Sequence, residues 1–134
     1  MIREVIVDVQ QIALPEVHRK DPWGYELQVD IGGCNNNILD PEMIKKFVIG
    51  LCDRINMERY KEPAIIYFEL GDNSGYSLTQ IIYTSLISAH FVDSTMEGFL
   101  NIFSCKTYDA QVVIQYIIDF FEPIGIDFRM VARG

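Results

Sequence analysis

The chain has 134 residues, 49% of them hydrophobic, which is enough to bury one core and too few for two, so we expect a single domain over residues 1–134. Its 19 acidic and 11 basic residues give a net charge of −8. Because the basic residues are scattered and form no stripe that could neutralise phosphates, the composition argues against nucleic acid and anionic membranes as partners.

Alternating apolar and polar residues predict two strands in the first part of the chain. The first covers residues 5–9, where valines occupy every second position, and the second covers residues 25–31. Between them, LPEVHRKDPWG at residues 14–24 contains two prolines and a glycine, which is typical of a loop.

Two helices are predicted, each introduced by an aspartate. Asp40 is the expected N-cap of a helix within residues 40–57, with Pro41 at the first helical position, where its missing N–H has no partner to lose. Asp109 is the expected N-cap of a second helix over residues 110–122. Both segments repeat apolar residues at helical spacing, which predicts one face packed against a core.

The remaining apolar segments are predicted strands. PAIIYFEL at residues 63–70 is followed by strands at 76–83, 86–92 and 97–105, and a last strand is expected around residues 126–130. The short turns between the middle strands indicate an antiparallel meander. The predicted fold class is therefore α+β, a two-layer sandwich with a mainly antiparallel sheet and two helices packed on one face.

The three cysteines, Cys34, Cys52 and Cys105, form neither a CxxC pair nor a group with nearby histidines. This odd number argues against a disulfide framework and a zinc site, so we expect no metal and a reducing compartment. Charged residues interrupt the first ten residues, unlike in a signal peptide, and no stretch is long enough to span a bilayer. We therefore expect a cytoplasmic protein.

Polar and reactive residues interrupt the predicted strands, although no Gly-rich phosphate loop, GxSxG or HExxH motif occurs. Each of Ser77, Ser85, His90 and Cys105 has an ordinary explanation, as a turn serine, a half-buried histidine or a buried cysteine. Their spacing says more, because in a hairpin that turns near Thr84 residue 77 lies opposite residue 90. The next strand then returns beside His90, with Cys105 near its far end.

The segment from residue 75 to residue 105 resembles the core of the prokaryotic S-adenosylmethionine decarboxylases, which are self-cleaving pyruvoyl enzymes of polyamine (spermidine) biosynthesis. In that family one serine becomes the pyruvoyl group, a second serine lies eight positions before it, a histidine five after it and a cysteine twenty after it. Those places hold Ser85, Ser77, His90 and Cys105. The likeness covers residues 23–122 and leaves residues 1–22 as an N-terminal strand-and-loop extension of a divergent member.

The resemblance implies a role for each of these residues. Ser85 Oγ would attack the carbonyl of Thr84, and the chain would then break between them and leave a pyruvoyl group made from Ser85. His90 would be the base and Ser77 the hydrogen-bond donor in this step. The pyruvoyl group would withdraw electrons while the substrate loses carbon dioxide, and the Cys105 thiol would supply the proton that replaces it.

The resemblance also implies a homodimer with shared active sites. Five residues of extended strand span roughly 16 Å at about 3.3 Å per residue, which argues against one chain joining Ser85 to His90. We therefore expect a two-fold dimer in which His90 and Ser77 of one protomer serve Ser85 and Cys105 of the other.

The chain departs from the family at two groups of positions. Thr84 and Leu86 stand where the family has a glutamate and usually a histidine, which changes the turn at the cleavage point. The ribose-binding glutamate and the adenine-stacking aromatic are also replaced. The residues concerned are Ser94 and Gly71, with Asp93 as a substitute for the glutamate and Tyr67 or Phe68 as a substitute for the aromatic, unless those two pack in the core.

Three functions therefore remain open. The first is a pyruvoyl-dependent decarboxylase of S-adenosylmethionine, and the second is a pyruvoyl-dependent decarboxylase of a smaller amino acid. The third is a relative that does not cleave itself, has no catalytic activity and acts as a binding or regulatory partner, a reading suggested by Thr84 and Leu86.

Overall fold

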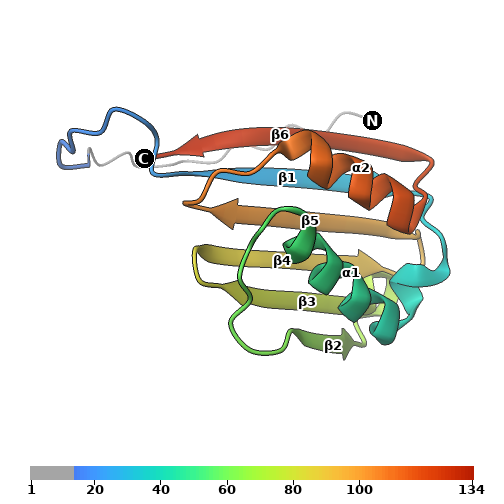
Figure 1. The fold of residues 1–134 in the computed structure, drawn as a ribbon. Coiled ribbons are helices and arrows are strands. Elements are labelled where there is room, and N and C mark those ends of the chain that lie inside the picture. The colour runs from blue at the N-terminus through green and yellow to red at the C-terminus, as the bar shows by residue number, and fades with distance from the viewer. Residues whose placement is uncertain (1–13) are drawn as a thin grey trace, which may run out of the picture.

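The computed structural model describes residues 14–134, so the strand predicted at residues 5–9 lies outside the described residues. Six strands and two helices follow one another along the described chain, with two short 3-10 turns (Figure 1). They are β1 (Gly24–Gly32), η1 (Asn36–Leu39), α1 (Pro41–Arg54), β2 (Ala64–Phe68), η2 (Gly71–Asn73), β3 (Gly75–Ile82), β4 (Ser85–Val92), β5 (Glu97–Ser104), α2 (Ala110–Phe121) and β6 (Gly125–Arg133).

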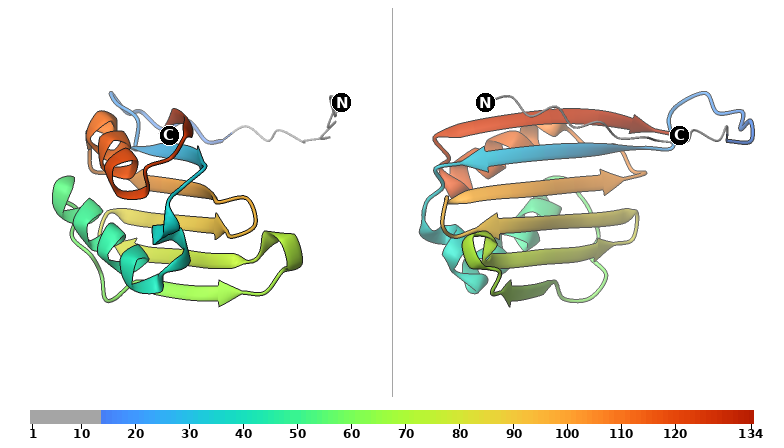
Figure 2. Two further views of the ribbon diagram at one scale, coloured as in Figure 1. Left: turned by 90° about the vertical axis from the view of Figure 1, so that its right-hand side faces the viewer. Right: turned by 180° about the vertical axis from the view of Figure 1, so that it is seen from behind.

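The strands form one antiparallel sheet in the order β2-β3-β4-β5-β1-β6. Strands β3, β4 and β5 are sequential neighbours, which confirms the predicted meander, and β1 lies between β5 and β6. Both helices cover the same face of the sheet, as the two views of Figure 2 show. The predicted α+β class with two helices on one face is confirmed.

The helices begin where the sequence predicts, because the aspartates cap them. The Asp40 side chain accepts a hydrogen bond from the N–H of Glu42 at 2.9 Å, and Pro41 takes the first helical position. The Asp109 side chain caps α2 in the same way. The apolar faces of the helices then pack against the inner face of the sheet. Fully buried members of this core are Leu27, Val29, Phe47, Leu51, Phe91, Leu100, Ile117 and Phe121.

Within residues 14–134, neither α1 nor α2 lies on the opposite face of the sheet, which we call the open face, although the short turn η2 reaches it (Figure 2). Side chains alternate between the two faces along each strand, so the cross-strand pairs with Ser77, Leu86 and His90 identify its members. Several of them are large and apolar and retain 38–53% of their exposure. These are Ile66, Phe68, Ile81, Leu86 and Phe99.

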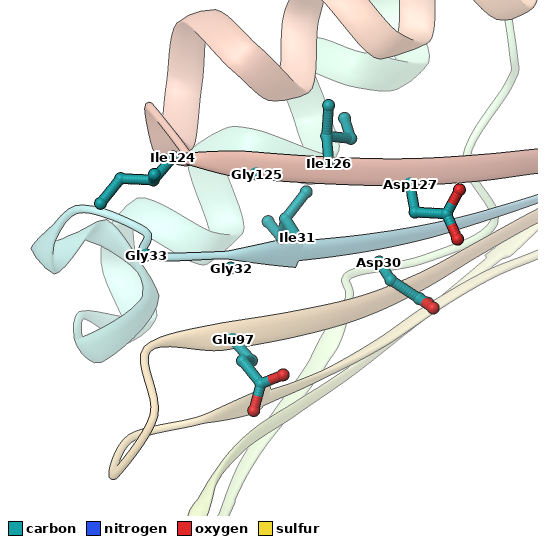
Figure 3. A pocket seen from close by; sticks show the side chains of 9 residues that line it. All are labelled: Asp30, Ile31, Gly32, Gly33, Glu97, Ile124, Gly125, Ile126 and Asp127. Carbon is teal, nitrogen blue, oxygen red and sulfur yellow. The ribbon is translucent and has the colours of Figure 1, made fainter. Parts of the chain in front are cut away.

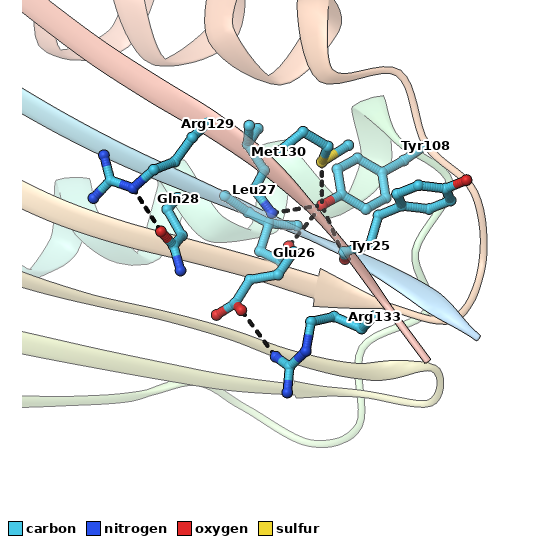
Figure 4. Close-up of polar contacts among 9 residues, drawn as sticks. Tyr25, Glu26, Leu27, Gln28, Tyr108, Arg129, Met130 and Arg133 are labelled. Atoms are coloured by element: carbon cyan, nitrogen blue, oxygen red, sulfur yellow. Dashed lines mark hydrogen bonds and ion pairs between the residues drawn. The ribbon is translucent and has the colours of Figure 1, made fainter. Parts of the chain in front are cut away.

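Tyr108 fastens the loop that leads from β5 to α2. Its hydroxyl accepts a hydrogen bond from the N–H of Leu27 at 3.1 Å and donates one to the carbonyl of Ile102 at 2.6 Å (Figure 4). Burial raises the pKa of this phenol to about 12. Because the loop starts at Cys105, this anchor holds the end of β5 against β1.

Candidate active site

Ser85 begins β4 directly after the tight turn that joins β3 to β4. The register pairs Ile82 with Ser85, so the turn contains only Tyr83 and Thr84. The φ angle of Ser85 is 154°, a conformation that glycine tolerates and that costs other residues about 1–3 kcal/mol. Within the described chain, the other non-glycine residues with positive φ have values between 46° and 61°, in the left-handed helical region. Backbone strain of this kind is concentrated at the predicted cleavage point.

The carbonyl of Thr84, which precedes Ser85, is itself held by a hydrogen bond. The backbone N–H of Cys105 donates to it at 3.1 Å. Ser85 pairs with Ser104 across the β4–β5 ladder, which brings the end of β5 to this turn. The structure therefore places Thr84, Ser85 and Cys105 together, and the Cys105 side chain is exposed. We call these three residues the cleavage turn.

Ser77 and His90 form a second cluster, the Ser–His pair. They lie directly opposite each other on β3 and β4, as the hairpin arithmetic predicts, and Ser77 Oγ lies 2.8 Å from His90 Nδ1. His90 Nε2 lies 3.0 Å from the carbonyl oxygen of Asn73. Because a carbonyl only accepts, Nε2 carries a proton and donates it to Asn73, and the Ser77 hydroxyl is the partner of Nδ1. The two contacts thus fix the orientation of the imidazole ring.

A glycine lets η2 come close enough to reach His90. A Cβ at Gly75 would lie 1.8 Å from the carbonyl oxygen of Phe91, so any larger residue would push the start of β3 away from β4. The contact between Asn73 and His90 depends on this close approach.

The cleavage turn and the Ser–His pair lie apart in one chain. Five residues along β3 separate Ser77 from Ile82, the partner of Ser85, which is roughly 16 Å of strand at about 3.3 Å per residue. The structure brings Ser77 to His90 and Ser85 to Cys105, but a single protomer does not join the two groups. The separation expected from the sequence is therefore present.

The predicted substrate-binding residues lie near the Ser–His pair. The Tyr67 hydroxyl donates to Asp93 Oδ2 at 2.8 Å, and this hydrogen bond raises the pKa of Tyr67. The backbone N–H of Asp93 donates to the carbonyl of Ser74 beside η2. Tyr67 and Phe68 are 44% and 42% exposed, so the alternative in which they pack in the core is wrong. They belong to β2, a short strand at the edge of the sheet.

Sequence reasoning missed two residues that contact these clusters, Ser104 and Asn73. Ser104 is fully buried and donates to Thr84 Oγ1 at 2.8 Å. A polar residue at an inward position of an apolar strand was the signal that could have found it. Asn73 acts through its backbone carbonyl, for which the sequence carries no signal.

A shallow pocket of about 480 Å³ lies elsewhere, at the junction of β1, β6 and the start of β5 (Figure 3). Its carboxylates belong to Asp30, Glu97 and Asp127, and Arg129 lies 3.6 Å from Asp30 and 3.7 Å from Asp127. None of the predicted site residues lines it. Within residues 14–134, no three His, Cys, Asp or Glu side chains converge in a way that could hold a metal ion. The helices of this part of the chain are too short or too polar to cross a membrane.

Comparison with known proteins decides the family. The family model described as S-adenosylmethionine decarboxylase matches residues 25–134, from β1 through β6, and so includes both clusters. The chain belongs to the S-adenosylmethionine decarboxylase family. Members of this family are pyruvoyl-dependent carboxy-lyases. The comparison with curated proteins yields no match.

The fold is that of a solved S-adenosylmethionine decarboxylase. The crystal structure of the adenosylmethionine decarboxylase from Aquifex aeolicus VF5 superposes with a TM-score of 0.68 at 20% sequence identity. The match covers 85% of this chain and 92% of that one. The resemblance seen in the sequence is therefore confirmed at the level of family and fold.

Proposed function

We propose that this protein cleaves itself between Thr84 and Ser85 and then acts as a pyruvoyl-dependent decarboxylase of S-adenosylmethionine in polyamine (spermidine) biosynthesis. One observation carries the proposal: a serine with a strained φ of 154° directly follows a carbonyl that accepts a hydrogen bond from the Cys105 N–H. Such a donor stabilises the negative charge that develops on a carbonyl oxygen under attack. The residues present therefore fit the formation of a pyruvoyl group at Ser85.

Self-cleavage uses only atoms of the chain and one water molecule. Ser85 Oγ attacks the carbonyl carbon of Thr84, the C–N bond breaks, and the hydroxyl proton passes to the nitrogen to leave an ester and a free amine. Loss of the Ser85 α-proton then breaks the ester C–O bond and leaves Thr84 with a carboxylate. The dehydroalanine that remains tautomerises to an imine, and water converts the imine to a ketone and ammonia.

The base for these steps comes from a second protomer. His90 Nδ1 would take the proton, and the Ser77 hydroxyl and the Asn73 carbonyl hold the ring in place. Since roughly 16 Å of strand separates the Ser–His pair from Ser85 in one chain, a two-fold homodimer with shared sites would bring them together. The half-exposed apolar side chains of the open face, such as Ile81, Leu86 and Phe99, supply a surface for such a dimer.

The mature enzyme would use the same residues around the substrate. A pyruvoyl group supplies electron withdrawal from the carbon that loses carbon dioxide. The exposed Cys105 thiol lies at the cleavage turn and would donate the proton that this carbon then needs. Phe68, Tyr67 and Asp93 would bind the rest of the substrate. Phe68 and Tyr67 are exposed on β2 beside the start of β3, and Tyr67 contacts Asp93, which follows the strand that carries His90.

A smaller amino acid is the second candidate substrate. The Ser94 hydroxyl donates to the carbonyl of Asp72 at 2.6 Å, so it is engaged with η2 instead of being free for a ribose. Gly71, also in η2, has no side chain to stack on a base. These contacts occupy the positions that the resemblance assigns to the nucleoside, and they favour a substrate that lacks one.

Intact-mass analysis tests the proposal, with Ser85→Ala as the uncleaved control. We expect the purified protein to yield two fragments that meet at residues 84 and 85, the second without a free α-amine. A panel of amino acids and S-adenosylmethionine, assayed for carbon dioxide release, then separates the two substrates. A single unbroken mass that hydroxylamine does not cleave would overturn the decarboxylase and favour a binding or regulatory partner.

A further inference from the structure

Ser104 is a fully buried serine whose hydroxyl belongs to an ordered chain of hydrogen bonds. The backbone N–H of Lys106 donates to Ser104 Oγ at 3.0 Å, and Ser104 Oγ donates to Thr84 Oγ1 at 2.8 Å. The Thr84 hydroxyl in turn donates to Met57 Sδ at 3.5 Å. The chain thus joins the end of β5, the cleavage turn and the segment after α1.

Filling space in the core does not explain the hydrogen bonds of the Ser104 hydroxyl. A buried hydroxyl costs free energy unless it is hydrogen-bonded, and here both the proton and a lone pair of Ser104 have partners. Its neighbour on the same face of β5, Ile102, is also fully buried and apolar. An alanine would fill most of the same space, so the hydroxyl is explained by what it holds, which is Thr84.

Thr84 is held at two points on either side of its Cα. The Cys105 N–H fixes its carbonyl, and Ser104 fixes its hydroxyl. Because threonine is β-branched, an anchored Oγ1 leaves its χ1 torsion no freedom. A strained φ such as that of Ser85 persists only where the surroundings hold both neighbours in place. Without the second anchor, the turn can rotate until Ser85 reaches an ordinary conformation.

We propose that Ser104 is a positioning residue for self-cleavage: its hydrogen bond to Thr84 Oγ1 keeps the carbonyl carbon of Thr84 facing Ser85 Oγ. This inference rests on the proposed function. Ser104 exchanges no atoms in the reaction, in which the Ser85 Oγ–C bond forms, the C–N bond breaks and the hydroxyl proton passes to the nitrogen. Its contribution is geometric, because an acyl shift is fast only when the attacking oxygen stays close to the carbonyl carbon.

The test follows the rate of cleavage of freshly synthesised full-length chain by intact mass. Ser104→Ala removes the donor, and Thr84→Val removes the acceptor while keeping the β-branched shape. We expect each to slow cleavage by roughly tenfold, the effect of one orienting hydrogen bond. The double variant is expected to be no slower than either single one, because both changes remove the same bond. Ser104→Thr keeps the hydroxyl and is expected to restore the rate.

Folding is measured separately, as the melting temperature of each substitution in a Ser85→Ala background. Thr84→Val leaves the bond from Lys106 to Ser104 intact, and Met57 Sδ lies 3.6 Å from Ser104 Oγ as an alternative acceptor. This variant therefore decides the question if Ser104→Ala fails to fold. Single variants that cleave at the wild-type rate, or single effects that multiply in the double variant, would overturn the positioning role and leave the proposed function standing. A wild-type chain that never cleaves would overturn both.

Discussion

The cleavage turn and the Ser–His pair differ in backbone strain and in the contacts that hold them. The cleavage turn has a strained φ at Ser85, and hydrogen bonds from the Cys105 N–H and the Ser104 hydroxyl hold Thr84 in place. The Ser–His pair is a side-chain arrangement on unstrained strands, with His90 oriented by Ser77 and by a carbonyl. One cluster offers a nucleophile and an electrophile, the other offers a base, and neither holds all the parts of the reaction.

The largest effect on the rate of self-cleavage is expected from dimers in which one protomer lacks Ser85 and the other lacks His90. Ser85→Ala removes the nucleophile and should abolish cleavage, and His90→Ala should slow it by roughly a hundredfold or more, the usual contribution of a general base. Co-expression of differently tagged variants makes mixed dimers. We expect only the His90→Ala chain to be cleaved in them, because its Ser85 meets the intact His90 of its partner.

Intact mass of the separated chains gives the result, and each variant expressed alone is the control. If the His90→Ala chain is cleaved no faster in the mixture than alone, the clusters do not cooperate between protomers and the shared site is wrong. Size-resolved assays add a second check, because a fully active monomer contradicts the same idea.

The next largest effect is expected from loosening the loop that begins at Cys105. This change should disturb the cleavage turn more than the Ser–His pair. Tyr108→Phe removes the hydrogen bonds to Leu27 and Ile102 that anchor the loop beginning at Cys105. Leaving those buried groups unpaired should destabilise the fold by about 1–3 kcal/mol. Urea unfolding measures this loss, and a tyrosine of the exposed surface, Tyr83→Phe, is the matched control.

Tyr108 also predicts a dependence of stability on pH. Its pKa is raised to about 12 in the folded state, above an ordinary value of about 10, so the folded state holds the phenol proton more tightly. The resulting stabilisation is fully present below about pH 10 and is lost as the pH rises toward 12. Tyr108→Phe should remove this part of the alkaline decline, and an unchanged profile would show that Tyr108 is not its source.

The pairing of Ser77 with His90 could be predicted from sequence, whereas the contacts that hold the cleavage turn could not, for a physical reason. Hairpin register follows from counting residues on either side of a turn, so Ser77 opposite His90 is a local result. The contacts of Ser104 with Thr84 and of Thr84 with Met57 join segments that the chain brings together only after folding. A strained φ likewise cannot be predicted, because no residue type is specific for it.

Edge strands account for the other error. PAIIYFEL is apolar enough to suggest a buried strand, yet β2 is a five-residue edge strand with Tyr67 and Phe68 exposed. The apolar content of a strand does not show whether its side chains are buried in the core or exposed at the edge of the sheet. That ambiguity is resolved only by knowing where the helices lie.

The smallest expected effect is a difference in stability between two variants, which reports the backbone strain at residue 85. Ser85→Gly and Ser85→Ala both remove the nucleophile and should both stay uncleaved, so they differ only in how well residue 85 tolerates a φ of 154°. If the turn is strained as described, the glycine variant should be more stable than the alanine variant by about 1 kcal/mol, after the greater flexibility of glycine in the unfolded chain offsets part of the relief. Thermal unfolding should then show a melting temperature a few degrees higher for glycine. Equal or reversed melting temperatures would mean that residue 85 relaxes freely, and the contrast between a strained turn and an unstrained Ser–His pair would no longer hold.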